Sequence, residues 1–194
     1  MSLFKLYFTL GLQHIADLNG YDHILFILTL CVVYSLKEWK RVLILITAFT
    51  IGHSLTLALA TLDLVRVDGE LIEFLIPLTI FLTALANVII RKQRVSPLLH
   101  GLKYSAALFF GLIHGLGFSN YLRSLLGSER GLLLPLFSFN VGIEAGQILV
   151  VAAIMLLSKI VIDLLRFPGR EWHLLLSGAG LGVSLVLMIE RFPY

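Results

Sequence analysis

Long hydrophobic runs constrain this chain more than any other feature. Five of them are about 20 residues long or longer, at roughly residues 41–62, 71–90, 103–122, 132–158 and 172–190. About 20 predominantly apolar residues are needed for a helix to cross the hydrocarbon core of a bilayer. Residues 20–36 form a shorter run, and residues 3–18 form one that is apolar at its start and polar at its end. We therefore predict an all-α, polytopic transmembrane helix bundle with six helices and a short N-terminal seventh.

The composition supports a membrane protein. Of the 194 residues, 58% are hydrophobic and 14% are charged, whereas soluble domains carry about 25% charged residues. The chain has room for one bundle domain over residues 1–194. The basic residues lie at the ends of the hydrophobic runs, so we expect membrane lipid and no nucleic acid as a partner. Cys31 is the only cysteine, which excludes an internal disulfide and a thiolate metal cluster and predicts a small buried side chain.

The charged residues between the runs predict the orientation of the bundle. Three connections are basic, and they contain Lys37, Lys40 and Arg41, then Arg91, Lys92, Arg94 and Lys103, then Lys159, Arg166 and Arg170. Short loops rich in Lys and Arg stay in the cytoplasm. We therefore predict that the C-terminal Tyr194 and the turn at Asn19-Gly20 lie outside. The N-terminus is expected in the cytoplasm if residues 3–18 cross the membrane.

Several of these runs carry ionisable residues that a membrane helix should exclude. A charged side chain near the bilayer centre costs about 2.5 to 3.5 kcal/mol even on the most lenient insertion scale. The set consists of His14, Asp22, His23, His53, His114 and Glu144. At 1.5 Å per residue, His53 lies about 13 Å below the outer end of its run, and the set falls in the outer half of the membrane. Residues of this kind from separate helices predict one intramembrane site.

Glu144 belongs to a polar face of its own helix. Asn140, Glu144 and Gln147 are spaced by four and three residues, so they line one side of the helix. A structural ion pair is the simpler interpretation of Glu144, but no Lys or Arg occurs at a matching depth. A bound cation, a proton or a histidine is therefore the expected partner.

The other candidates also have simpler interpretations. Thr50 and Ser54 flank His53 and are expected to support the site, although hydrogen bonding between helices would explain both hydroxyls. Asp22 follows Asn19 closely and could serve only the start of a helix, where a carboxylate is favoured by the helix dipole. His14 could be a histidine near the lipid headgroups.

The donor set predicts a metal ion. Imidazole and carboxylate groups without thiolate suit Zn, Ni, Co or Fe(II) and disfavour Cu(I). Three histidines with one or two carboxylates are sufficient for a coordination number of about four to six. We therefore expect a divalent transition metal (Ni, Co or Zn) as the ligand.

At these residues the sequence resembles the HupE/UreJ family of bacterial membrane proteins. The matching stretches run from His14 to Phe26, from Phe49 to Thr56, from Phe110 to Phe118 and from Phe139 to Gln147. The resemblance implies a permease for nickel or cobalt in the bacterial inner membrane, linked to hydrogenase and urease maturation. It also implies that His14, Asp22, His23 and His114 contact the metal.

Three hypotheses follow, of which a divalent-cation transporter is favoured. The alternative is an intramembrane zinc-dependent hydrolase acting on lipid or peptide, with Glu144 as the base and Ser54 or Asn140 as an oxyanion donor. The third is a metal-free bundle with a structural or proton-relay network. A homo-oligomer is left open. The Gly-His-Ser and Ile-His-Gly segments are too short to indicate an internal repeat.

Overall fold

The computed structural model describes residues 2–18, 20–90, 97–126 and 131–193, with the side chains of residues 97–99, 120, 123 and 126 left out. Some residues used above to predict topology lie outside the described residues, namely Asn19, Arg91, Lys92, Arg94 and Tyr194. The all-α prediction is confirmed, because every regular element of the described part is helical. The elements are α1 (Leu3–Ala16), α2 (Asp22–Cys31), η1 (Leu36–Glu38), α3 (Trp39–Thr61), α4 (Gly69–Ile89), α5 (Pro97–Gly117), α6 (Ser119–Leu126), α7 (Leu133–Lys159), η2 (Ile160–Leu164) and α8 (Gly169–Glu190).

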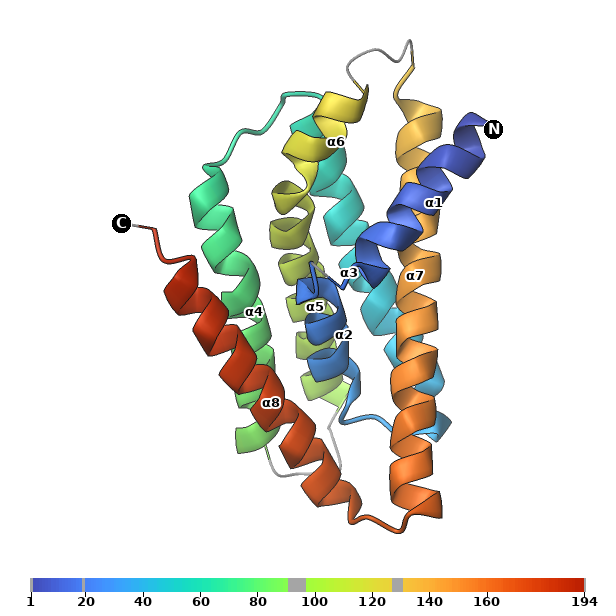
Figure 1. The fold of residues 1–194 in the computed structure, drawn as a ribbon, viewed down its shortest axis with the longest axis vertical. Coiled ribbons are helices and arrows are strands. Elements are labelled where there is room, and N and C mark those ends of the chain that lie inside the picture. Colours follow the sequence, from blue (N-terminus) through green and yellow to red (C-terminus); the bar gives the residue numbers. More distant parts are fainter. Residues whose placement is uncertain (1, 19, 91–96, 127–130, 194) are drawn as a thin grey trace.

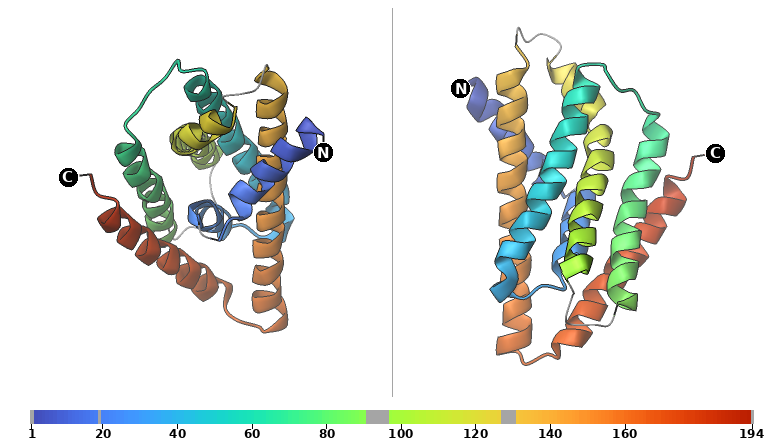
Figure 2. Two further views of the ribbon diagram at one scale, coloured as in Figure 1. Left: turned by 45° about the horizontal axis from the view of Figure 1, so that its top comes forward. Right: turned by 180° about the vertical axis from the view of Figure 1, so that it is seen from behind.

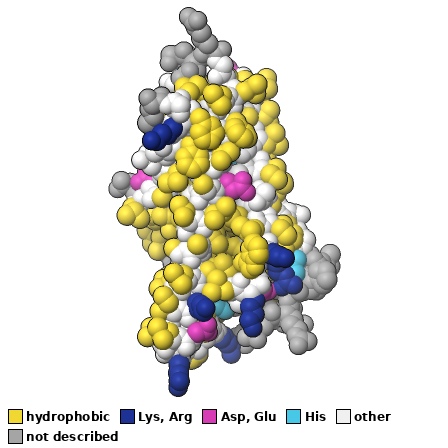
Figure 3. All heavy atoms as spheres, turned by 90° about the vertical axis from the view of Figure 1, so that its right-hand side faces the viewer, with side chains coloured by type: hydrophobic (Ala, Val, Ile, Leu, Met, Phe, Trp, Pro, Cys, Tyr) yellow, Lys and Arg dark blue, Asp and Glu magenta, His cyan; other side chains and the backbone are white. Residues whose placement is uncertain are grey.

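The length and composition of these helices fit a membrane bundle. Within the described residues, four helical segments are long and apolar enough to cross a membrane: Leu36–Thr61, Gly69–Ile89, Leu133–Leu164 and Gly169–Glu190. Figure 3 views the side of the bundle on which α7 lies and shows a mainly hydrophobic surface, with Lys and Arg gathered towards its lower end. Outward-facing side chains of α3 such as Ile51 and Leu55 are more than half exposed, as expected of residues in contact with lipid.

The two N-terminal helices together make one crossing. In Figures 1 and 2, α1 descends from the upper end to the middle of the bundle, and α2 continues from there towards the lower end. With 14 and 10 residues, they are about 21 Å and 15 Å long, so neither can span a bilayer alone. The prediction that the turn at Asn19-Gly20 lies outside is therefore wrong for its described part, because the end of α1 and the start of α2 lie midway between the two ends of the bundle. The N-terminus shares the upper end of the bundle with α6.

The connections between the long helices alternate as the sequence predicted. The described parts of the connections α2–α3, α4–α5 and α7–α8 lie at the lower end, and the α3–α4 connection lies at the upper end (Figure 1). The lower end therefore holds the basic residues Lys37, Lys40, Arg41, Lys159, Arg166 and Arg170. The fold thus keeps the described basic residues of the α2–α3 and α7–α8 connections at one end of the bundle, as the positive-inside rule requires.

Glycines allow two pairs of helices to pack in backbone contact. A Cβ at Gly111 of α5 would overlap the Phe49 carbonyl of α3, and a Cβ at Gly142 of α7 would overlap the Phe8 carbonyl of α1. Close approach at small residues is the usual way in which membrane helices associate. Gly111 and Gly142 are therefore positions at which two helix backbones touch. These two pairs, α3 with α5 and α1 with α7, form the closely packed centre of the bundle.

Candidate metal centre

Four histidines from four helices meet in the middle of the bundle, and we refer to His14, His23, His53 and His114 as the histidine cluster. Ring nitrogens of His14, His23 and His53 all lie within 4.8 Å of one another. The ring centres of His14 and His23 are 4.5 Å apart, and those of His23 and His114 are 5.4 Å apart. The structure therefore brings together four of the six ionisable residues singled out in the sequence.

The break between α1 and α2 makes this cluster. His14 lies in the last turn of α1, and His23 lies in the first turn of α2. Backbone at Asp17 is extended, so α1 ends and the chain turns before α2 begins. Irregular backbone at membrane depth is tolerated where it is buried in protein or lines a site. Because the helix is broken here, two residues separated by nine positions face each other rather than lying on successive turns.

The cluster has unused ligand atoms. Nε2 of His14, Nε2 of His23 and both ring nitrogens of His53 are buried and have no hydrogen-bond partner among the described residues. Each polar group left unpaired in this way costs about 1 to 3 kcal/mol. Neutral imidazole nitrogens are common ligands of divalent transition metals, and a bound cation would compensate for this cost. The residues present therefore fit a metal ion.

Thr79 of α4 fixes the ring of His114. The Thr79 hydroxyl donates its single proton to the Ile76 carbonyl at 2.7 Å, and Thr79 Oγ1 lies 2.9 Å from His114 Nε2. Because that hydroxyl proton is already used, His114 Nε2–H must be the donor in the second hydrogen bond. The lone pair then lies on His114 Nδ1, which is buried and has no partner among the described residues. Such a contact behind a histidine orients it for metal binding.

Aromatic side chains enclose the cluster. The ring centre of Phe118 lies 3.9 Å from that of His14. The ring centres of Phe26 and Phe49 lie 5.0 Å and 5.1 Å from that of His114. His53 and His114 are 0% and 1% exposed, so neither imidazole is in contact with bulk water. Exclusion of water strengthens electrostatic interactions with a bound ion.

Asp22 has a partner that the sequence did not suggest. Arg191, at the C-terminal end of α8, donates from Nη1 to Asp22 Oδ2 at 2.8 Å. Asp22 Oδ1 remains buried without a hydrogen-bond partner among the described residues. Asp22 therefore links the start of α2 to α8, beside His23.

Glu144 does not belong to the group of ligand atoms around His14, His23 and His53. Thr47 of α3 donates to Glu144 Oε1 at 2.9 Å, a hydroxyl contact that the sequence did not predict. A cation, proton or histidine as the partner of Glu144 stays a prediction.

Of the other supporting residues, Thr50 and Gln147 serve the contact between α3 and α7. Thr50 donates to Gln147 Oε1 at 2.8 Å, and Asn140 Oδ1 is buried without a partner in the described structure. Ser54 is half-buried on α3. The hydrogen bond between Thr50 and Gln147 corresponds to the simpler interpretation given above for the hydroxyls.

Sequence reasoning missed Thr79 and Arg191. Thr79 is two residues after Pro77 in an apolar helix, and the residues on either side of it, Leu78 and Ile80, are apolar. Arg191 resembles any basic residue at a helix end. Only the packing of α4 and α8 against the cluster shows their positions.

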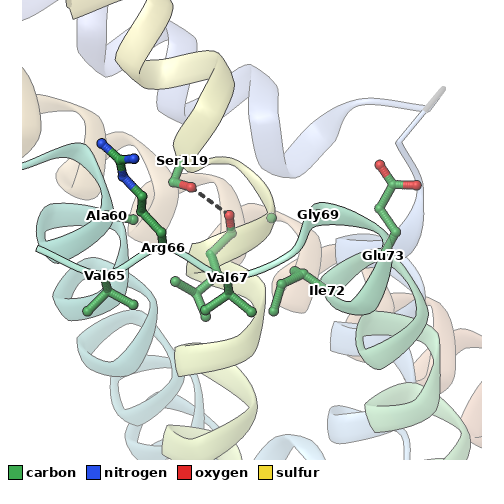
Figure 4. A pocket seen from close by; sticks show the side chains of 10 residues that line it. Ala60, Val65, Arg66, Val67, Gly69, Ile72, Glu73 and Ser119 are labelled. Carbon is green, nitrogen blue, oxygen red and sulfur yellow. Dashed lines mark hydrogen bonds between the residues drawn. The ribbon is translucent and has the colours of Figure 1, made fainter. Parts of the chain in front are cut away.

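A cavity of about 390 Å³ lies at the upper end of the bundle, above His114. Its walls come from the end of α3, the 62–68 connection, the start of α4 and the α5–α6 junction (Figure 4). Gly117 and Leu116 line it, three and two residues beyond His114. The cavity does not include the histidines, but it approaches the cluster from one side.

Comparison with known proteins gives one match. Residues 1–189 match the family model described as HupE / UreJ protein. The match covers nearly the whole chain and includes every residue of the histidine cluster. Neither a curated protein nor a solved structure matches the chain.

Proposed function

The chain belongs to the HupE/UreJ family of bacterial membrane proteins, and from this premise we propose that it transports a divalent transition-metal cation, nickel or cobalt, through the histidine cluster. This family is associated with nickel and cobalt handling. The cation is the substrate, and His14, His23 and His53 would hold it, with His114 as the fourth ligand. The location is the inner membrane, with the basic connections in the cytoplasm.

One observation carries the proposal: four imidazoles from four helices, three of them buried and His14 half-buried, converge at a helix break and leave ring nitrogens without partners among the described residues. Broken helices at the middle of the membrane are typical of ion sites in transporters. A cluster of neutral imidazoles without thiolate suits nickel and cobalt. In the proposed orientation the cavity above His114 opens to the outside, so the cation would approach from there.

The arrangement does not favour a hydrolase. The proposed base Glu144 is held by Thr47 and stands apart from the ligand atoms of the cluster. A hydrolytic zinc site requires a base positioned next to the metal-bound water. A purely structural role for the cluster is also disfavoured, because a structural network would pair its buried nitrogens rather than leave them unsatisfied.

The test measures both binding and uptake. Purified protein is incubated with Ni²⁺ or Co²⁺, the bound metal is counted by elemental analysis, and uptake is followed in proteoliposomes. We expect one cation per chain and metal-dependent uptake, both lost in His53→Ala. His173→Ala is the matched control, since His173 lies at the start of α8 outside the cluster. Unchanged metal content in His53→Ala would exclude the proposed site.

A further inference from the structure

The two halves of the chain repeat each other in structure. Each half contains a helix that ends in a break, a short helix and two long helices: α1 to α4 in the first half and α5 to α8 in the second. The sequence keeps a trace of the repeat. Gly11-Leu12-x-His14 recurs as Gly111-Leu112-x-His114, and Phe49-x-x-Gly52 recurs as Phe139-x-x-Gly142. The prediction that the chain lacks a usable repeat is therefore wrong.

The glycine contacts show in distances that the two halves are equivalent. A Cβ at Gly11 would overlap the Phe139 carbonyl and lie 3.0 Å from Ile143 N. A Cβ at Gly111 would overlap the Phe49 carbonyl and lie 3.0 Å from His53 N. Position for position, the contact of α1 with α7 thus matches the contact of α5 with α3.

The reciprocal contacts agree as well. A Cβ at Gly142 would overlap the Phe8 carbonyl and lie 3.0 Å from Leu12 N. A Cβ at Gly52 would overlap the Leu108 carbonyl and lie 3.0 Å from Leu112 N.

The halves run in opposite directions. In Figures 1 and 2, α1 and α7 run from the upper end downwards, whereas α3 and α5 run from the lower end upwards. The halves are therefore inverted repeats related by an approximate two-fold axis in the membrane plane. Transporters built in this way bind substrate at the repeat interface and expose it alternately by rocking one part against another.

The pair formed by α4 and α8 departs from this symmetry. Helix α4 packs against α5 and α2, but α8 forms no comparable interface with α1 or α6 among the described residues. At the lower end the pair holds α2, where Asn87 donates to the Thr29 carbonyl at 2.6 Å and Gly180 packs against Thr29. In transporters built from inverted repeats, one part of the molecule rocks against the rest around the binding site, and the α4–α8 pair is the part that departs from the symmetry.

One close contact between α4 and α5 lies beside the cavity. A Cβ at Gly117 of α5 would lie 2.9 Å from Ile76 Cδ1 of α4. Ile72 and Gly117 line the cavity, and Ile76 lies three residues from Thr79, which contacts His114. The contact between Ile76 and Gly117 therefore lies between the cavity and the cluster.

We propose that the contact between Ile76 and Gly117 is the outer gate of the carrier, opened when the α4–α8 pair rocks against the inverted-repeat core of α1, α3, α5 and α7. The inference rests on the proposed function, because a gate has meaning only if the cation moves. Its specific content is that α4 must separate from α5 during transport, whereas α3 and α5 remain together.

Reversible cross-linking tests this gate. In a Cys31→Ala background, the pair Ile76→Cys/Gly117→Cys is joined with a short thiol-specific cross-linker that a reductant reverses. The control pair is Thr56→Cys/Leu112→Cys, because Thr56 Oγ1 lies 2.8 Å from the Leu112 carbonyl across the α3–α5 contact. We expect the first cross-link to reduce nickel uptake into proteoliposomes at least 10-fold, with recovery on reduction, and the second to leave uptake unchanged.

A second measurement applies to cysteine variants that bind nickel but do not transport it. Protein loaded with Ni²⁺ is exposed to a chelator, and we expect the Ile76–Gly117 cross-link to slow metal loss at least 10-fold. Uptake unaffected by the first cross-link, or equal rates of metal loss with and without it, would overturn the gate. Absence of uptake in the parent protein would instead overturn the proposed function, so the two failures are distinguishable.

Discussion

At the scale of single residues, the orientation of His114 depends on the hydroxyl of Thr79. This hydroxyl donates to the Ile76 carbonyl and is left as an acceptor for His114 Nε2–H. The free nitrogen of the ring is then Nδ1, which has no partner among the described residues. The direction of one hydroxyl proton thus decides which nitrogen could bind a cation.

Thr79→Val should weaken nickel binding by roughly 10-fold to 100-fold, the usual effect of removing a residue that orients a metal ligand. Thr79→Ser should retain binding, because it keeps the hydroxyl. Isothermal titration of purified protein measures both affinities. Thr83→Val is the control, since Thr83 donates only to the Thr79 carbonyl, one turn away. Equal affinities for Thr79→Val and the parent would remove Thr79 from the site.

The ion pair between Arg191 and Asp22 is the second contact at this scale. Arg191→Gln should destabilise the protein, because it leaves the Asp22 carboxylate without its charged partner in a mostly buried position. The double variant Asp22→Asn/Arg191→Gln should recover part of the loss, since both charges are then absent. Thermal unfolding in detergent gives the coupling, with Arg170→Gln as the control. Strictly additive effects would show that the pair contributes nothing.

At the scale of elements, two features build the site: a helix broken near the middle of the bundle and helices packed in backbone contact. The break between α1 and α2 brings His14 to within 4.5 Å of His23, measured between ring centres. The contacts at Gly52 and Gly111 hold α3 against α5 and thereby set the separation of His53 from His114.

Gly142→Ala should destabilise the protein by about 1 to 3 kcal/mol, because the new methyl group would meet the backbone carbonyl of Phe8. Gly178→Ala should have no such effect, since nothing lies within 4 Å of a Cβ there, and alanine even favours the helix. The melting temperatures of both variants in the same detergent provide the comparison. Equal melting temperatures for the two variants would show that α1 and α7 are not in close contact at Gly142.

At the scale of the whole molecule, the cluster joins both halves of the inverted repeat. His14, His23 and His53 come from the first half and His114 from the second. A cation bound there would stabilise the assembled bundle, because the unfolded chain cannot hold four imidazoles in one place.

Nickel should therefore raise the melting temperature of the protein. At a free nickel concentration of 100 times Kd, binding raises the free energy of unfolding by about 2.7 kcal/mol. Mg²⁺ should have no effect, because it prefers oxygen ligands. His53→Ala should lose the response to nickel, whereas His173→Ala should keep it. An equal nickel-induced shift in the parent and in His53→Ala would indicate binding outside the cluster.

The sequence by itself determined the membrane character, the helical class and the identity of the four histidines. These properties depend on local composition: runs of about 20 apolar residues must be helical in lipid, and an imidazole within such a run stands out. The close packing at Gly111 and Gly142 could be predicted for the same reason, since small residues spaced by four form one stripe on a helix.

Only the tertiary structure decided which of these residues meet. In the folded chain His14 packs against His23, Asp22 forms an ion pair with Arg191, and Glu144 accepts a hydrogen bond from Thr47. Asp22 and Arg191 are 169 positions apart, and their contact depends on how α8 crosses the bundle. The inverted repeat is difficult to detect in the sequence, because the backbone contacts that the two halves share require only a few glycines at matching positions. Every other position can change.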